Sequence, residues 1–195
     1  MGTGGAGSAA ADAAMDRYAD GDASAFAEVY DALAPRLYGY FRRRVRSDSL
    51  AEDLIQQTFL HIHRARGTFI RGAEVLPWAF AIGRRLMIDG IRRDRRSPPI
   101  VGDSADVDVV ASDGLADDLV HARQLATRAQ AVLEHLPEPQ RSAFELVRQE
   151  GFSLRQAAQT LGITVGAVKQ RAHRAYQALH LALGDDAAGE GIDTP

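Results

Sequence analysis

The chain has 195 residues, a formal net charge of −3 and no cysteine. This length allows one ordinary domain or two small ones, and the missing cysteines exclude disulfides and thiolate zinc sites, as in a reducing compartment. The first residues lack the basic and apolar regions of a secretory signal, and no apolar run approaches the roughly 18 residues of a membrane span. We therefore expect a cytoplasmic protein without membrane insertion.

The charge is unevenly distributed along the chain. Nine arginines lie between Arg64 and Arg96, and six Lys or Arg residues lie between Arg141 and Tyr176. Between these two segments, residues 97–120 hold six aspartates and no basic side chain. The pattern predicts two candidate nucleic-acid surfaces joined by an acidic connector.

The N-terminal residues 1–14 are rich in Gly and Ala, and we expect them to be disordered. Apolar residues then recur at spacings of three and four between Phe26 and Phe41, which predicts a helix. Pro35 lies inside that stretch and is expected to kink or split it.

Two further helices are expected before residue 96. Ser49 and Glu52 have the spacing of a capping box that opens the first of them. A loop over 67–76 follows, and Pro77 suits the first turn of the next helix. The apolar positions of that helix predict a buried side formed by Phe80, Met87 and Ile91.

The connector 97–117 has neither helix nor strand periodicity, which favours an interdomain linker over a loop inside one domain. Helical periodicity resumes from Leu119, and no convincing strand pattern occurs anywhere. We therefore predict an all-α fold of two small helical domains, 15–96 and 118–183, joined by a flexible acidic linker at 97–117. A loose acidic tail is expected at 184–195.

The sharpest local pattern predicts a helix-turn-helix over 153–176. Ser153 and Gln156 form a capping box, Ala158 permits a close helix crossing, and Gly162 suits a turn with positive φ. A second helix capped by Thr164 would then enter the major groove of DNA. Its exposed face would comprise Thr164, Ala167, Lys169, Gln170, Arg171, His173 and Arg174. An ordinary surface helix of a bundle is the alternative reading of the same face.

Three stretches together resemble the extracytoplasmic-function (ECF) subfamily of the sigma-70 family of RNA polymerase sigma factors. Ala51–Leu60 is similar to the family's AEDLxQxTF docking helix, and Pro77–Arg93 is similar to its promoter-melting helix. The segment from Leu136 to Arg174 resembles its LPxxqR, GxSxxEIAxxLgis and vGTVKSRxxRA run. The resemblance covers about residues 24–96 and 120–182, with all three motifs in family order and spacing.

The resemblance implies three sets of site residues. The residues expected to dock on core polymerase are Glu52, Asp53, Gln56 and Gln57. Those expected to recognise and melt the minus-ten element are Phe69, Arg71, Trp78, Arg84, Arg85, Arg92 and Arg93. Those expected to contact the minus-thirty-five element are Thr164, Lys169, Gln170, Arg171, His173 and Arg174. The structural alternatives are a partly buried Trp78, a buried Phe69 and charged faces that only contact solvent.

Three positions depart from the family pattern. Arg85 stands where the family usually has Asn, Gln156 replaces an acidic residue, and Gln170 replaces a small Ser. The changes at Arg85 and Gln170 bear on the promoter sequence that is read. Asp89 is a poor phosphate contact, so we expect it to orient a neighbouring arginine or to pair within its domain.

The implied partners are core RNA polymerase, promoter DNA and an anti-sigma factor. No metal site is expected, since His61 and His63 are two residues apart on a helix and do not share a face. No cofactor or catalytic activity is expected either, since the sequence has no Gly-rich phosphate loop and no Ser/His/Asp signature. Two alternatives remain at this stage. One is a helix-turn-helix regulator that acts without polymerase docking, and the other is a sigma-like decoy that binds an anti-sigma protein.

Overall fold

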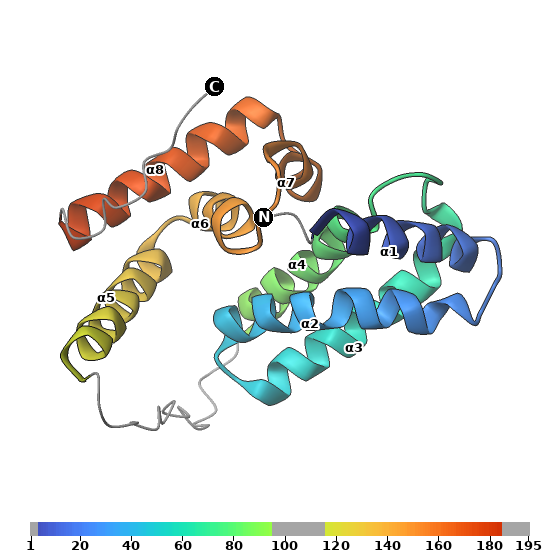
Figure 1. The fold of residues 1–195 in the computed structure, drawn as a ribbon, viewed down its shortest axis with the longest axis horizontal. Helices are drawn as coiled ribbons and strands as arrows, with labels where there is room; N and C mark the ends of the chain where they lie inside the picture. Colours follow the sequence, from blue (N-terminus) through green and yellow to red (C-terminus); the bar gives the residue numbers. More distant parts are fainter. Residues whose placement is uncertain (1–3, 95–115, 185–195) are drawn as a thin grey trace. The chain divides into compact units, whose positions relative to one another are not determined.

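The computed structural model describes residues 4–94 and 116–184, and the described residues are helices and the turns between them, with no strand. The chain divides into two compact units, Met1–Asp106 and Val107–Pro195, which are coloured blue to green and yellow to red in Figure 1. The all-α prediction is therefore confirmed for the described residues. Most of the expected linker and nearly all of the expected tail lie outside them.

The first unit is a helical bundle (Figure 1). Its described elements are α1 (Gly4–Ala19), α2 (Ala25–Val45), α3 (Asp48–Ala65), the 3₁₀ turn η1 (Arg66–Thr68) and α4 (Val75–Asp94). Each helix packs against the next, and α4 also contacts α1 and α2. Among the largest fully buried side chains here are Met15, Leu33, Leu37, Tyr40, Phe41, Ile62, Phe80 and Met87. Phe80 and Met87 confirm the predicted buried side of α4, whereas Ile91 is only half-buried.

The expectation of a disordered segment at 1–14 is wrong from Gly4 onward, because these residues form most of α1. Ala11, Ala14, Met15 and Tyr18 recur at spacings of three and four, and all are buried. The small alanines let α1 pack closely on α2. Burial of this stripe outweighs the weak helix propensity of the glycines at the start of the segment.

Helix α2 runs through Pro35 without a break, so the expected split does not occur. Pro35 and Asp31, whose carbonyl would otherwise receive the missing N–H, both lie on the exposed side of the helix. Water can therefore satisfy that carbonyl. The helix ends at Val45, and its C-cap Arg46 adopts a left-handed conformation with φ 54°.

The cap of α3 is Ser47 rather than the predicted Ser49. The Ser47 side chain accepts a hydrogen bond from the Leu50 backbone N–H at 3.4 Å. The helix therefore begins two residues earlier, and Asp48 occupies its first turn. Hydrogen bonds from Tyr38 and Arg42 stabilise the Asp48 carboxylate and lower its pKa below the usual value. These contacts from α2 fix the start of α3, and the local Ser-x-x-Glu pattern could not show them.

The expected loop at 67–76 is shorter in the structure. The turn η1 includes Gly67 and Thr68, and α4 begins at Val75, so the connection itself is residues 69–74. Pro77 lies in the first turn of α4, as predicted.

Gly83 lies where α4 packs closely against α2 and α3. A Cβ atom at this position would lie 2.6 Å from Phe41 Cζ and 3.1 Å from Thr58 Oγ1. Both neighbours are fully buried, and the Thr58 hydroxyl donates to the Leu54 carbonyl at 2.6 Å. The site therefore has no room for a methyl group.

We expect Gly83→Ala to lower the free energy of unfolding by about 1–3 kcal/mol through overpacking, although alanine favours a helix by roughly 1 kcal/mol. Urea denaturation measures the change. Gly90→Ala in the same helix is the matched control, because nothing lies within 4 Å of its added Cβ. That control should gain about 0.5–1 kcal/mol. Equal stabilities of the two variants would contradict the close packing at Gly83.

The second unit is built around its last helix. Its described elements are α5 (Ala116–His135), α6 (Glu138–Phe144), the π-helical turn η2 (Glu145–Gln149), α7 (Leu154–Leu161) and α8 (Val165–Leu183). Helix α8 packs against α5, α6 and α7. Between α6 and η2, Arg141 Nε donates to Glu145 Oε1 at 2.6 Å, and this pair is almost fully buried. Gly151 reverses the chain after η2 with φ 69°.

Candidate functional site

The helix-turn-helix has the local geometry that the sequence predicts. Both bonds of the capping box are present, with Ser153 Oγ accepting from Gln156 N at 3.1 Å and Gln156 Oε1 accepting from Ser153 N at 2.9 Å. Gly162 has φ 64°, and Thr164 Oγ1 accepts from the Ala167 N–H at 3.2 Å. Val168 is fully buried behind this turn. The start of α8 is thus fixed relative to α7.

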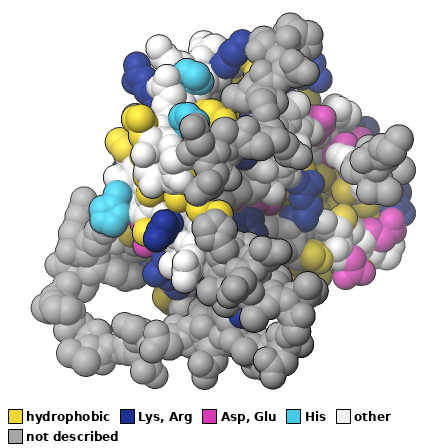
Figure 2. All heavy atoms as spheres, turned by 60° about the vertical axis from the view of Figure 1, so that its left-hand side comes forward, with side chains coloured by type: hydrophobic (Ala, Val, Ile, Leu, Met, Phe, Trp, Pro, Cys, Tyr) yellow, Lys and Arg dark blue, Asp and Glu magenta, His cyan; other side chains and the backbone are white. Residues whose placement is uncertain are grey.

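The solvent side of α8 carries most of the predicted DNA-reading residues. Thr164, Lys169, Gln170, His173 and Arg174 are exposed, whereas Arg171 is half-buried. On the left-hand side of Figure 2, Lys, Arg and His side chains lie among hydrophobic ones, and few acidic side chains are seen there. Such a surface suits the phosphates of a duplex and the edges of its bases.

Sequence reasoning missed Val165 at the start of α8, which is 44% exposed. An apolar side chain at the first position of such a helix can contact a thymine methyl group. The exposed face predicted from the sequence did not include this residue.

The residues predicted to melt the minus-ten element lie in two different environments. Phe69 is buried, Trp78 is half-buried, and their rings lie 5.1 Å apart. Phe69 therefore does not present its ring to solvent and anchors the start of the 69–74 loop. Next to it, Ile70 is 76% exposed, and the sequence analysis did not single it out because a loop has no periodicity to indicate its outward side.

The arginines of α4 lie along its second half. Arg85, Arg92 and Arg93 are exposed, whereas Arg84 is half-buried. Arg85 Nε lies 3.9 Å from Asp89 Oδ2, one turn further on, as expected for Asp89. Both groups of this pair are largely exposed, so it contributes little to stability and leaves the guanidinium accessible.

Three aspartates of the N-terminal segment contact the 69–74 loop and the start of α4. Asp12 Oδ1 accepts from Val75 N at 2.7 Å, and Asp16 accepts from Gly72 N at 3.1 and 3.2 Å. Asp20 forms an ion pair with Arg71. Burial is the main cause that raises the pKa of Asp12, opposed by its bond to Val75 N–H. The sequence analysis assigned no role to these aspartates, and the disorder expected of residues 1–14 covered Asp12 alone.

The predicted docking residues form one continuous exposed strip on α3. Glu52, Asp53, Gln56 and Gln57 all lie on its solvent side. The opposite side of the helix is buried through Leu54, Ile55, Thr58, Phe59 and Ile62. Packing of α3 is therefore explained by its buried side, and it does not explain why Glu52, Asp53, Gln56 and Gln57 occupy the exposed strip.

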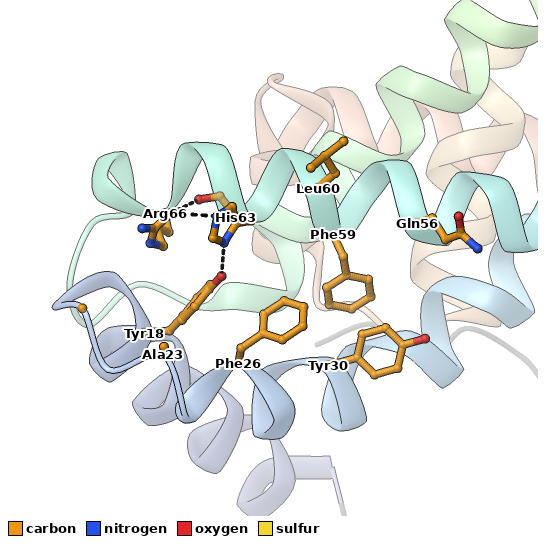
Figure 3. Close-up of a pocket in the computed structure, with 10 residues that line it drawn as sticks. Tyr18, Ala23, Phe26, Tyr30, Gln56, Phe59, Leu60, His63 and Arg66 are labelled. Atoms are coloured by element: carbon orange, nitrogen blue, oxygen red, sulfur yellow. Dashed lines mark hydrogen bonds between the residues drawn. The ribbon is translucent and has the colours of Figure 1, made fainter.

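An aromatic groove adjoins this strip, between α3 and the chain from Tyr18 to Tyr30 (Figure 3). The Phe59 ring lies 4.5 Å from Tyr30 and 6.0 Å from Phe26. At the other end, the Tyr18 hydroxyl lies 2.5 Å from His63 Nδ1. Gln56 lines the groove as well as the strip, so the groove extends the same surface.

Neither a metal centre nor a membrane span is found in the described part of the chain. No group of three or more His, Cys, Asp or Glu side chains there is arranged to hold a metal ion. None of the described helices combines the length and apolar character that would carry it across a bilayer.

Comparison with protein families gives two matches. Residues 29–97 match the family model described as Sigma-70 region 2, and residues 126–179 match Sigma-70, region 4. The first match contains α3, the 69–74 loop and α4, and the second contains α6, α7 and most of α8.

Curated relatives and solved structures agree with these matches. The RNA polymerase sigma factor CarQ of Myxococcus xanthus is 34% identical over 88% of this chain and 96% of its own length. The ECF RNA polymerase sigma factor SigF of Caulobacter vibrioides is 36% identical over 86% of this chain and 90% of its own. The sigma factor RpoE of Bartonella quintana, solved with the anti-sigma factor NepR, has a TM-score of 0.63 at 25% identity, covering 81% of this chain and 96% of that one. CnrH, solved with the cytosolic domain of CnrY, has a similar fold, with a TM-score of 0.68 at 24% identity over 91% of this chain and 99% of that one.

Proposed function

Because the chain belongs to the ECF subfamily of the sigma-70 family and is an RNA polymerase sigma factor, we propose a division of labour between its two units. The first unit binds core polymerase through the α3 strip and opens the minus-ten element with the 69–74 loop and α4. The second unit binds the minus-thirty-five element through α8. The protein acts in the cytoplasm and itself catalyses no reaction.

The observation that carries this proposal is the presence of both surfaces in one chain. The exposed polar strip of α3 contains Asp53 and Gln56, and the exposed face of α8 contains Lys169 and Arg174. A helix-turn-helix regulator that acts alone would not need the α3 strip. A decoy for an anti-sigma protein would be free to lose its basic faces, and this chain keeps them on both α4 and α8.

The melting role of the first unit is supported by what surrounds the 69–74 loop. Ile70 is exposed beside Arg71, and Trp78 is partly accessible behind them. Separating a base from its stack costs a few kcal/mol, which contacts to the extruded base must offset. We infer that the buried Phe69 anchors this loop in the core, while Ile70 and Arg71 face the separated DNA strand. The arginines of α4 then bind the phosphates of that strand.

An anti-sigma partner is part of the same proposal. Support comes from RpoE of Bartonella quintana, which was solved in complex with the anti-sigma factor NepR. A protein that covered the α3 strip would prevent polymerase docking, and one that covered α8 would prevent promoter recognition. Such a partner therefore controls the factor by occupying its working surfaces.

Run-off transcription with purified core polymerase tests the proposal. Genomic fragments are transcribed with core enzyme alone and with the protein added, and the start sites are mapped. We expect new start sites that share sequence elements near minus ten and minus thirty-five. If the protein binds duplex fragments but gives no core-dependent transcript, the regulator alternative replaces this proposal.

A further inference from the structure

We propose that α1 positions the 69–74 loop through Asp12, Asp16 and Asp20, and that these carboxylates thereby set the base selectivity at the minus-ten element. They are positioning residues that act through the loop. This inference rests on the proposed role of the loop in promoter opening. It adds a determinant outside both matched regions, since the region 2 match begins at residue 29.

The three aspartates are four residues apart, so they lie along one side of α1 and its C-terminal end. Each one binds a different point of the connection. Asp20 pairs with the Arg71 side chain, Asp16 accepts from Gly72 N and Asp12 accepts from Val75 N. The contacts follow the loop from its middle to the first residue of α4.

The loop itself is largely open to solvent at its centre. Ile70 is 76% exposed, and Gly72 adopts φ 72°. Phe69, packed on Trp78, anchors its beginning, and the Ala73 N–H donates to the Ile70 carbonyl at 3.0 Å. A segment that selects a base must be held to within about 0.5 Å, and ordering a free loop on binding costs conformational entropy for each residue. Because the carboxylates of Asp12, Asp16 and Asp20 already order the loop in the folded protein, little of this entropy is lost when DNA binds.

The charges favour this role over direct contact with DNA. Carboxylates beside a strand-binding loop repel phosphates, so Asp12, Asp16 and Asp20 oppose binding unless they position something that promotes it. The Arg71 side chain is 72% exposed although it pairs with Asp20. One side of its guanidinium is therefore held by α1 while the other remains open to a phosphate oxygen.

The test uses the full-length protein with Asp16→Ala and Asp20→Asn, separately and together. Glu28→Gln is the matched control, because it also removes a carboxylate that pairs with α1, through Arg17, but away from the loop. Asp16→Asn is the conservative variant, since its amide oxygen can still accept from Gly72 N. Two quantities are measured, namely amide hydrogen exchange at Gly72 in the free protein and initiation by core polymerase on templates with each base at every minus-ten position.

We expect Asp16→Ala to speed exchange at Gly72 by roughly fivefold, as for the loss of one ordinary hydrogen bond. In the double variant, the ratio of initiation on the preferred base to that on the next base should fall roughly tenfold, which is within the range carried by one base pair. Asp16→Asn and Glu28→Gln should behave like the wild type in both measurements. Affinity for core polymerase should not change.

Two results would overturn the inference. One is unchanged exchange at Gly72 in Asp16→Ala, which would show that the carboxylate does not hold the loop. The other is faster exchange with unchanged base preference in the double variant, which would show that holding the loop does not set selectivity. Failure of the proposed function would be distinguished by the wild-type protein, which would then give no transcript that depends on core polymerase.

Discussion

Replacing both Asp53 and Gln56 with arginine is expected to weaken binding to core polymerase by about a hundredfold or more. The two side chains are exposed and lie three residues apart on α3, so they face the same way. The Asp53 substitution reverses a charge and the Gln56 substitution adds one. Both place like charges or unpaired groups opposite the polymerase, which lowers the binding free energy by several kcal/mol. Because neither side chain is part of the core, the melting temperature should stay within a few degrees of the wild type.

Affinity is measured by titrating core polymerase with fluorescently labelled protein at constant salt. The matched control is Ala27→Arg with Asp31→Arg, two exposed positions of α2 that give the same change in net charge. That control should bind core as the wild type does. Equal weakening by both double variants would mean that net charge governs the affinity, and unchanged affinity of the α3 variant would remove the strip from the docking surface.

The parts of the fold that the sequence predicted are those fixed by local chemistry. The capping box at Ser153, the positive φ of Gly162 and the cap at Thr164 each depend on residues within a few positions. Helical periodicity likewise identified Phe80 and Met87 on the buried side of α4, because one apolar stripe suffices to predict which side packs inward.

The errors arose where tertiary contacts decide the outcome. Alanine and glycine at the start of the chain resemble a flexible segment, and packing against α2 and α4 makes α1 stable. Ser47 replaces Ser49 as the cap because α2 supplies Tyr38 and Arg42 to bind Asp48. The candidate site shows the same limit. The family resemblance supplied the α3 residues and helical position most of the exposed residues of α8, whereas the burial of Phe69 and the exposure of Ile70 depend on how the loop is held.

The two kinds of contact made by α8 are expected to separate by mutation. Gln170 is exposed on α8, and its amide can bind an adenine edge through two hydrogen bonds. Gln170→Ala should therefore reduce discrimination at one position of the minus-thirty-five element by about 1–3 kcal/mol and leave the other positions unchanged. Arg171 is half-buried and charged, and a guanidinium on this helix suits a phosphate contact.

Arg171→Ala should accordingly weaken binding to all sequences alike and lower the slope of log affinity against log salt by about one. Both variants are measured as full-length protein in complex with core polymerase, on a panel of promoters that differ only in the minus-thirty-five element, at several salt concentrations. Arg155→Ala, an exposed arginine of α7, serves as the control for loss of charge outside the recognition helix. A uniform loss in Gln170→Ala together with a position-specific loss in Arg171→Ala would reverse the assignment. A base contact changes the ratio of the affinities for different sequences, whereas a phosphate contact changes the affinity for all of them alike. Indistinguishable profiles of the two variants would therefore show that Gln170 and Arg171 do not divide base reading and phosphate binding between them.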